Sequence, residues 1–400
     1  MNMIFRHTEA TEQRVFSLTI GALISYMPIN TFLNKFLTRM IGMQTYFDTL
    51  LCYFVLYVLI FQSIMFIYKR IKTDISASAV ILLIVWFASY LNLDDANAQY
   101  MFTRLRDIHE NPFYRLFLYS FSGYVFVRYI YDYNIFKKTL KIYSIVVVLC
   151  SVITFFLTLS EDYQEQYMVF SYDMLIHSTF LILLYFEEKK IINLIIGIIG
   201  IVMIFIAGSR GAMASFMLCM FVYVLFRKTK STRKVLLVIV SLVALFFVLF
   251  YFEEILNYMD ILAERLGINS RTLTMMREGE LFNDSGRSEI QEKIISNFNF
   301  FGHGLYAERF FDEGSSYAHN LIIEIIYHFG YFFGIPILLC ILWLLLNGVF
   351  AKNAQLRFLV IVFMSAGLFK LFFSGSYLHQ EPSLYIMLGL CVNASKKRRC

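Results

Sequence analysis

The chain has 400 residues, of which 59% are hydrophobic and 16% are charged, and its mean hydropathy is +0.64. This composition excludes an ordinary soluble domain, in which about a quarter of the residues are charged. The net charge of +6 does not indicate nucleic-acid binding, because the basic residues follow a pattern of membrane topology.

Apolar segments long enough to cross the hydrocarbon layer of a membrane recur along the whole chain. The first half contains six of them, at 15–30, 47–68, 75–91, 113–131, 139–160 and 168–186. The second half contains six more, at 190–208, 211–227, 235–252, 329–350, 357–374 and 381–394. The spans are too long and too apolar for barrel strands. The sequence therefore predicts an all-α polytopic integral membrane protein with about 12 transmembrane helices.

The orientation follows from the lysines and arginines, which gather on the cytoplasmic side of short loops. They occur in alternate loops and at the C-terminus, at 69–72, 137–141, 189–190, 227–234 and 396–399. We therefore expect both termini to be cytoplasmic. No cleavage site for a signal peptide follows the polar first 14 residues, so the first span is expected to remain.

We expect a single membrane domain, 1–400. One predicted external loop, 253–318, lies between spans nine and ten and is much longer than the other loops. Apolar residues recur at helical spacing at 255–266 and again at Ile290 and Ile294, where Ser288 and Gln291 form a possible capping pair. We expect two amphipathic helices there. A shorter external loop, 92–111, also carries charges.

The junction of spans seven and eight reads Gly-Ser-Arg-Gly and contains Arg210. The planar guanidinium of arginine suits a diphosphate group, because it donates two parallel hydrogen bonds and stays charged. The alternative is a tight turn from which Arg210 extends to the membrane interface.

A second arginine, Arg287, lies in the long loop at the start of a predicted helix, where backbone N–H groups favour an anion. The alternative is a surface salt bridge with Asp284 or Glu289. The same anion-binding role is a weaker hypothesis for the other arginines of the loop, Arg265, Arg271, Arg277 and Arg309.

The segment Ser-Tyr-Ala-His-Asn precedes the tenth span and introduces a polar stripe on an apolar helix. Asn320, Glu324 and His328 lie four residues apart and so share one helix face. His319 precedes them and has a side chain that titrates near neutrality, as a general base requires. The alternative is a histidine that only caps the helix.

Other polar residues carry weaker signals. Asp173 and His177 in span six and Lys370 in span eleven are ionisable groups within spans, and Lys370 has Asp173 or Glu324 as a candidate ion-pair partner. His303 and Tyr306 belong to a glycine-rich turn. No metal or nucleotide motif is present, so neither a metal nor a cofactor is expected.

Three motifs, in this order and all on the predicted external side, resemble the O-antigen polymerase and O-antigen ligase superfamily. They are the Gly-Ser-Arg-Gly junction, the long loop with Gly-Arg and Phe-Gly-His-Gly-Leu, and the Ser-Tyr-Ala-His-Asn opening. The resemblance covers roughly residues 197–390. It implies a GT-C-like helical bundle in the bacterial inner membrane, with an undecaprenyl-diphosphate-linked oligosaccharide as substrate and a metal-independent active site at the periplasmic face.

In such an enzyme Arg210 and Arg287 would stabilise the diphosphate leaving group, and His319 would activate the acceptor hydroxyl. Aromatic residues, Tyr327 among them, would stack on sugar rings. The resemblance also implies a chain-length regulator and a flippase as partners. We expect the substrate-binding site to include Asn320, Glu324, His328, Tyr317, Tyr306, His303, Arg309 and Arg265.

Polymerase and ligase differ in the acceptor, which is another lipid-linked repeat unit or the lipid A core. The ligase-like pattern places Gly330 after His319, but a small residue or a tyrosine is expected where Phe333 stands. The glutamate after His-Asn and the Ser-Gly-Ser-Tyr turn at 374–377 favour a polymerase. A lipid-linked oligosaccharide flippase or another transporter is the alternative from a different class, although the long loop and the one-sided polar groups argue against it.

Overall fold

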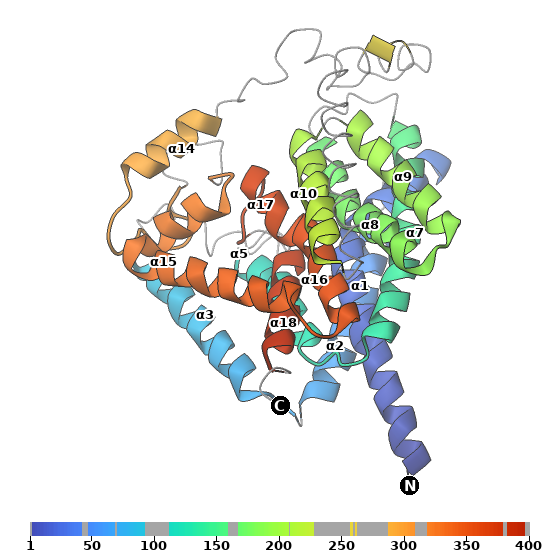
Figure 1. Ribbon diagram of the computed structural model, residues 1–400, viewed down its shortest axis with the longest axis horizontal. Coiled ribbons are helices and arrows are strands. Elements are labelled where there is room, and N and C mark those ends of the chain that lie inside the picture. The colour runs from blue at the N-terminus through green and yellow to red at the C-terminus, as the bar shows by residue number, and fades with distance from the viewer. Residues whose placement is uncertain are drawn as a thin grey trace. The chain divides into compact units, whose positions relative to one another are not determined.

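The computed structural model describes residues 2–41, 47–68, 70–92, 112–158, 167–207, 209–227, 257–258, 261, 287–308, 318–378 and 382–396. Within these ranges the regular elements are helices (Figure 1). By length and composition, seven helical segments of the described residues can cross a membrane, and three shorter apolar helices accompany them. The prediction of an all-α polytopic membrane protein is confirmed.

The described helices coincide with the predicted spans, apart from span 235–252, which lies outside the described residues. Helices α1 (Asn2–Ile41), α2 (Phe47–Ile67), α3 (Thr73–Asn92), α7 (Tyr133–Thr158), α8 (Tyr167–Glu188), α9 (Ile191–Ile206) and α10 (Arg210–Phe226) correspond to single spans. The fourth span is instead composed of α5 (Pro112–Tyr114), the π-helical η3 (Arg115–Phe121) and α6 (Ser122–Val127). The last three spans correspond to α15 (Leu321–Val349), to α16 (Ala354–Met364) with η5 (Ser365–Phe369) and α17 (Lys370–Phe373), and to α18 (Pro382–Lys396).

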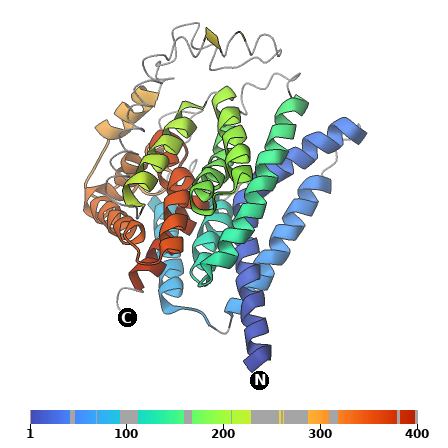
Figure 2. The same ribbon diagram turned by 45° about the vertical axis from the view of Figure 1, so that its right-hand side comes forward.

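The chain forms two compact units, the first of which comprises residues 1–23, 57–136 and 284–400. At its centre lies α18, which packs against α15, α16, α6 and both π-helical segments (Figures 1 and 2). Ile386, Met387 and Leu390 of α18 are fully buried. This apolar centre supports α15, whose first turns carry the polar residues of the stripe.

The second unit comprises residues 24–56 and 137–283. Its helix α8 packs against α9 and α10. Gly197 and Gly200 of α9 face Ile182 and Ser178 of α8, so the two backbones approach closely, as small residues allow in membrane helices.

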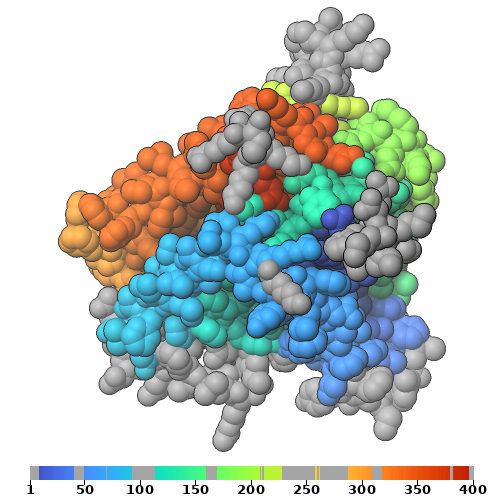
Figure 3. Space-filling model, turned by 90° about the horizontal axis from the view of Figure 1, so that it is seen from below, coloured from blue at the N-terminus to red at the C-terminus, as the bar shows by residue number. Residues whose placement is uncertain are grey.

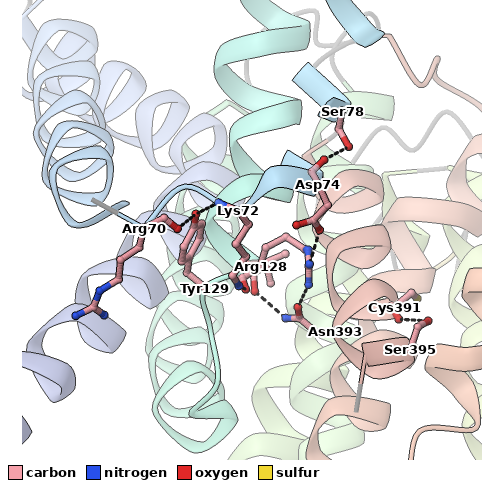
Figure 4. A network of polar contacts seen from close by, with 10 residues as sticks. Arg70, Lys72, Asp74, Ser78, Arg128, Tyr129, Cys391, Asn393 and Ser395 are labelled. Atoms are coloured by element: carbon pink, nitrogen blue, oxygen red, sulfur yellow. Dashed lines mark hydrogen bonds and ion pairs between the residues drawn. The ribbon is translucent and has the colours of Figure 1, made fainter. Parts of the chain in front are cut away.

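A buried arginine joins three segments of the first unit on the side that the sequence predicts to be cytoplasmic (Figure 4). The Arg128 guanidinium donates to Asp74 at 2.6 Å, at the start of α3, and to Asn393 of α18. Asn393 in turn donates to the Val127 carbonyl. Because Arg128 is 2% exposed, these acceptors replace the water that its charge loses on burial.

Helix α3 has an exposed apolar face, and the light-blue residues of α3 are open to view in Figure 3. The exposed side chains include Val80, Ile81, Ile84, Phe87 and Leu91. In a membrane protein such a face contacts lipid.

Candidate functional site

The candidate site is built at the start of α15, and Asn320 fixes where this helix begins. Asn320 is the N-cap, and its side-chain oxygen accepts hydrogen bonds from the backbone N–H groups of Ile322 (3.0 Å) and Ile323 (3.4 Å). These bonds satisfy N–H groups that the helix itself leaves unpaired. The helix begins at Leu321, eight residues before the predicted span, so the Asn320–Glu324–His328 stripe lies on its first turns.

His319 precedes the cap with a left-handed backbone, with φ of 54°. This conformation costs a non-glycine residue about 1–2 kcal/mol, so the surrounding structure has to hold it. Burial, together with the positive charge of Arg287, lowers the pKa of His319 to about 4. The imidazole is therefore neutral at neutral pH and able to accept a proton.

Arg287 is brought to His319 by helix α14 (Arg287–Ser296), of which it is the first residue. Its Nη1 donates to the carbonyl oxygen of Phe373, at the end of α17, at 2.8 Å. This bond uses one of the five guanidinium N–H groups. Arg287 and His319, two of the three predicted catalytic residues, thus lie close enough for the charge of one to affect the other.

Helix α14 confirms the second of the two amphipathic helices predicted in the long loop. Ile294 is fully buried and packs with Tyr327 and Ala318, while Ile290 covers this cluster. Gln291, predicted as part of a capping pair, donates instead to the carbonyl of Ala318 at 3.1 Å. The apolar face of α14 therefore fixes Arg287 beside the start of α15. The first predicted helix, 255–266, lies almost entirely outside the described residues.

The glycine-rich turn at 301–304 packs into a kink of α15. Gly330 interrupts the helix with φ of 67°, and the turn contains Gly302 with φ of 83°. Four backbone hydrogen bonds join the turn and the two residues before it to the kink. Their donor–acceptor pairs are His303–Tyr327 (3.0 Å), Gly304–His328 (3.0 Å), Tyr331–Asn299 (3.2 Å) and Phe332–Phe300 (3.0 Å). The turn thus supplies partners for backbone groups that the kink releases.

His303 and Tyr306 leave this turn in different directions. The His303 ring stacks on Tyr327 with centroids 4.5 Å apart, and its Nε2 lies 2.7 Å from the carbonyl oxygen of Asn297. Tyr306 is 1% exposed and belongs to a core cluster with Trp86 and Leu378. Tyr306 is therefore a core residue in this structure.

Glu324 and His328 of the polar stripe are buried and bonded to two other segments. Glu324 accepts a hydrogen bond from Ser376, and His328 Nδ1 lies 2.7 Å from the hydroxyl of Tyr377. His328 Nε2 contacts the carboxylate of Glu308, which sequence reasoning missed. Nothing in the sequence distinguishes Glu308 from the many other acidic residues of the long loop.

Burial and the charge of Glu324 raise the pKa of Tyr377 well above its ordinary value. Its hydroxyl therefore stays protonated at neutral pH. The turn 374–377, interpreted from its sequence as a polymerase-like feature, supplies both Ser376 and Tyr377 to the polar stripe.

Arg210 begins α10 in the second unit. Ser209, the N-cap of α10, accepts a hydrogen bond from the backbone N–H of Ala212 at 3.4 Å. Three other predicted binding residues, Tyr317, Arg309 and Arg265, lie outside the described residues.

The intramembrane residue His177 lies in the interior of the second unit. It is fully buried, with Nδ1 at 3.1 Å from the Ser144 hydroxyl and Nε2 at 3.3 Å from the Ile24 carbonyl. Both ring nitrogens of His177 therefore have partners within the unit. Asp173, on the same helix, lines a cavity of about 260 Å³ with Met27, Ser151, Thr154 and Phe170.

Comparison with known proteins adds one match. Residues 195–338 match the family model described as O-antigen ligase. Neither the curated proteins nor the solved structures contain a match. The matched range contains Arg210, Arg287, the glycine-rich turn and the first half of α15, which confirms the resemblance that the motifs indicated. Over residues 195–338 the chain is therefore similar to the O-antigen ligase family, within the superfamily of membrane enzymes that process O-antigen.

Proposed function

We propose that the protein is a membrane glycosyltransferase that polymerises undecaprenyl-diphosphate-linked O-antigen repeat units at the periplasmic face of the bacterial inner membrane. The acceptor hydroxyl of one repeat unit attacks the sugar carbon that carries the diphosphate of another. The new glycosidic bond forms as the bond to the diphosphate breaks, and undecaprenyl diphosphate leaves with the electron pair.

The observation that carries this proposal is that α14 places Arg287 beside His319 at the start of α15, within the range that matches the family model. The positive charge of Arg287 disfavours the protonated form of His319. It suits a reaction, however, in which the diphosphate gains negative charge while His319 beside it gains a proton. Arg287 would bind the diphosphate, whose negative charge would offset the effect of Arg287 on His319. The part of the pKa lowering that Arg287 causes would then be offset when the substrate binds, which would make His319 a stronger base.

The Gly-Ser-Arg-Gly motif carries the proposal that Arg210 is a second cationic residue for this reaction. A diphosphate leaving group develops negative charge, and fixed guanidinium groups stabilise such charge without a metal ion at the reacting atoms. We propose that both termini are cytoplasmic and that the start of α15 is periplasmic, because the basic loops lie on the opposite side from these residues.

The sequence of the Ser374–Tyr377 turn favours a polymerase, because it resembles that of polymerases. Ser376 and Tyr377 of this turn contact Glu324 and His328 of the polar stripe. The family description favours a ligase, which would transfer the glycan to the lipid A core. The two activities share the chemistry and differ in the acceptor.

Deletion of the gene in its native host, followed by gel analysis of the lipopolysaccharide, separates these functions. Core that carries a single repeat unit is the result expected for a polymerase. Bare core, with polymer accumulating on the lipid carrier, would assign a ligase, and an unchanged ladder would remove both readings in favour of a transporter.

Complementation with variants then tests the residues. We expect Arg287→Ala and Arg210→Ala to reduce the rate about 10²–10³-fold and His319→Ala about 10²–10⁴-fold. A matched control is Arg357→Ala, because Arg357 also donates to a backbone carbonyl, that of Ala351 at 2.9 Å, on the predicted cytoplasmic side. Full activity of all three variants at normal membrane levels would refute the assigned roles.

A further inference from the structure

Three buried side chains beneath the start of α15 form a cluster with the composition of a metal site. Glu308, Glu324 and His328 each offer one ligand atom, and these three atoms lie within 4.8 Å of one another. The three residues are 3%, 1% and 2% exposed. They come from the segment after the glycine-rich turn and from two successive turns of α15.

The donor set is one imidazole nitrogen and two carboxylate oxygens. Zn²⁺ accepts this combination, at about 2.0–2.2 Å from each atom, and so does Mn²⁺. Two ligand atoms of one zinc ion are at most about 4.4 Å apart. The cluster therefore needs only small side-chain movements to reach a bonding arrangement.

Neighbouring residues hold the ligands as outer-sphere groups do in metal sites. The second ring nitrogen of His328, Nδ1, lies 2.7 Å from the Tyr377 hydroxyl, which leaves Nε2 directed at Glu308. Ser376 donates to one oxygen of Glu324. Such contacts fix the orientation of ligating histidines and carboxylates.

The charge of the cluster also favours a cation. Two buried carboxyl groups, those of Glu308 and Glu324, lie together, and the ring nitrogen Nε2 of His328 contacts the carboxylate of Glu308. The other carboxylate oxygen of Glu308, Oε1, is buried and accepts no hydrogen bond within the described ranges. A buried carboxylate oxygen without a partner is costly, and a divalent cation would satisfy it.

We propose that Glu308, Glu324 and His328 bind a divalent first-row metal ion, with Zn²⁺ as the first candidate. The ion takes the place of the proton between His328 Nε2 and Glu308, and this proton is released on binding. It joins the segment at 302–308 to α15, and through Tyr377 and Ser376 it supports the 374–377 turn. Its role is structural, so the proposed diphosphate chemistry at Arg287 and His319 does not depend on it.

Metal content of the whole protein is the direct test. The full chain, purified in detergent with a tag that contains no histidine, is expected to hold about one metal ion by elemental analysis. Removal of the ion by a chelator should lower the thermal unfolding temperature, and Zn²⁺ alone should restore it. Co²⁺ added to the stripped wild-type protein should give the visible absorption bands of a nitrogen and oxygen site.

Variants locate the ion. Glu308→Gln and His328→Gln should lose most of the metal, whereas Glu292→Gln, an exposed position on α14, should keep it. A wild-type protein that neither retains metal nor binds Co²⁺ would overturn the proposal and leave a hydrogen-bonded cluster. Metal retained equally by both cluster variants and by the control would overturn it as well. Arg287→Ala should keep the metal while polymerisation is lost, so failure of this proposal and failure of the proposed function give different results.

Discussion

Gly302 and Gly330 face each other across the junction between the glycine-rich turn and the kink of α15. Both have positive φ, and a Cβ atom built on either residue would collide with the backbone nitrogen of the other. The two glycines therefore depend on each other, because each provides the space that the other backbone occupies. Their pairing fixes the register of the turn against α15, which follows His319 and carries His328.

Alanine at either glycine should destabilise the protein. The positive φ alone costs about 1–3 kcal/mol, and the collision with backbone adds to it because backbone cannot rotate away. Thermal unfolding in detergent measures the effect for Gly302→Ala and Gly330→Ala. Gly334→Ala, in the same helix and without a positive φ, should have a much smaller effect. Equal unfolding temperatures for all three variants would contradict the pairing.

Stability should decrease in mild acid because of His319. Its pKa is lowered to about 4 in the folded protein, so the unfolded chain, with a pKa near 6.5, binds the proton more readily. The contribution of neutral His319 to the free energy of unfolding is therefore fully present above about pH 6.5, and it is lost as the pH falls to about 4. The difference in unfolding temperature between about pH 7.5 and pH 5 should be smaller in His319→Gln than in wild type. Identical differences would show that His319 titrates normally.

Ser376→Ala should destabilise the polar stripe. The hydroxyl donates to the buried carboxyl group of Glu324, and removal of one partner from a buried hydrogen-bonding group costs about 1–3 kcal/mol. Ser296→Ala is the control, since Ser296 is exposed and donates to the Lys293 carbonyl at 2.9 Å. We expect a clear drop in unfolding temperature for the first variant alone.

Asp74→Asn should be one of the more damaging single substitutions in the first unit. It leaves the buried guanidinium of Arg128 without its carboxylate, which costs about 3 kcal/mol or more. The more exposed pair of Lys137 and Glu187, 3.3 Å apart, provides the comparison, because Glu187→Gln should cost about 0–1 kcal/mol. Similar unfolding temperatures for both variants would show that the Arg128 network is not stabilising.

Cysteine labelling tests the proposed topology. Ser288 and Lys352 are exposed, on α14 and in the turn between α15 and α16. A membrane-impermeant maleimide should label Ser288→Cys in intact spheroplasts, and it should label Lys352→Cys only after the membrane is permeabilised. The opposite labelling pattern would show that the protein has the reverse orientation in the membrane, with the candidate site on the cytoplasmic side.

The transmembrane helices were predictable because hydrophobicity over about 20 residues is a local property. The beginning of α15 was predicted less well. The span was predicted from residue 329, but the helix begins at Leu321. The reason is that other segments bury the polar stripe, so its residues are not exposed to water. The kink at Gly330 also escaped prediction, because it requires the turn at 301–304, which is distant in the sequence from the helix that it distorts.

The amino-acid sequence alone was enough to predict a polytopic membrane protein, the alternation of basic loops, the amphipathic α14 and the candidate residues His319 and Arg287. These features depend on composition, on period and on residue type at short range. The contacts between distant residues became visible in the folded chain: Glu308 with His328, Ser376 with Glu324, and Gly302 with Gly330. Such contacts join segments about 20 to 50 residues apart in the sequence. Patterns of residue spacing predict contacts only within one helix or strand, and the path of the loop between such segments depends on packing.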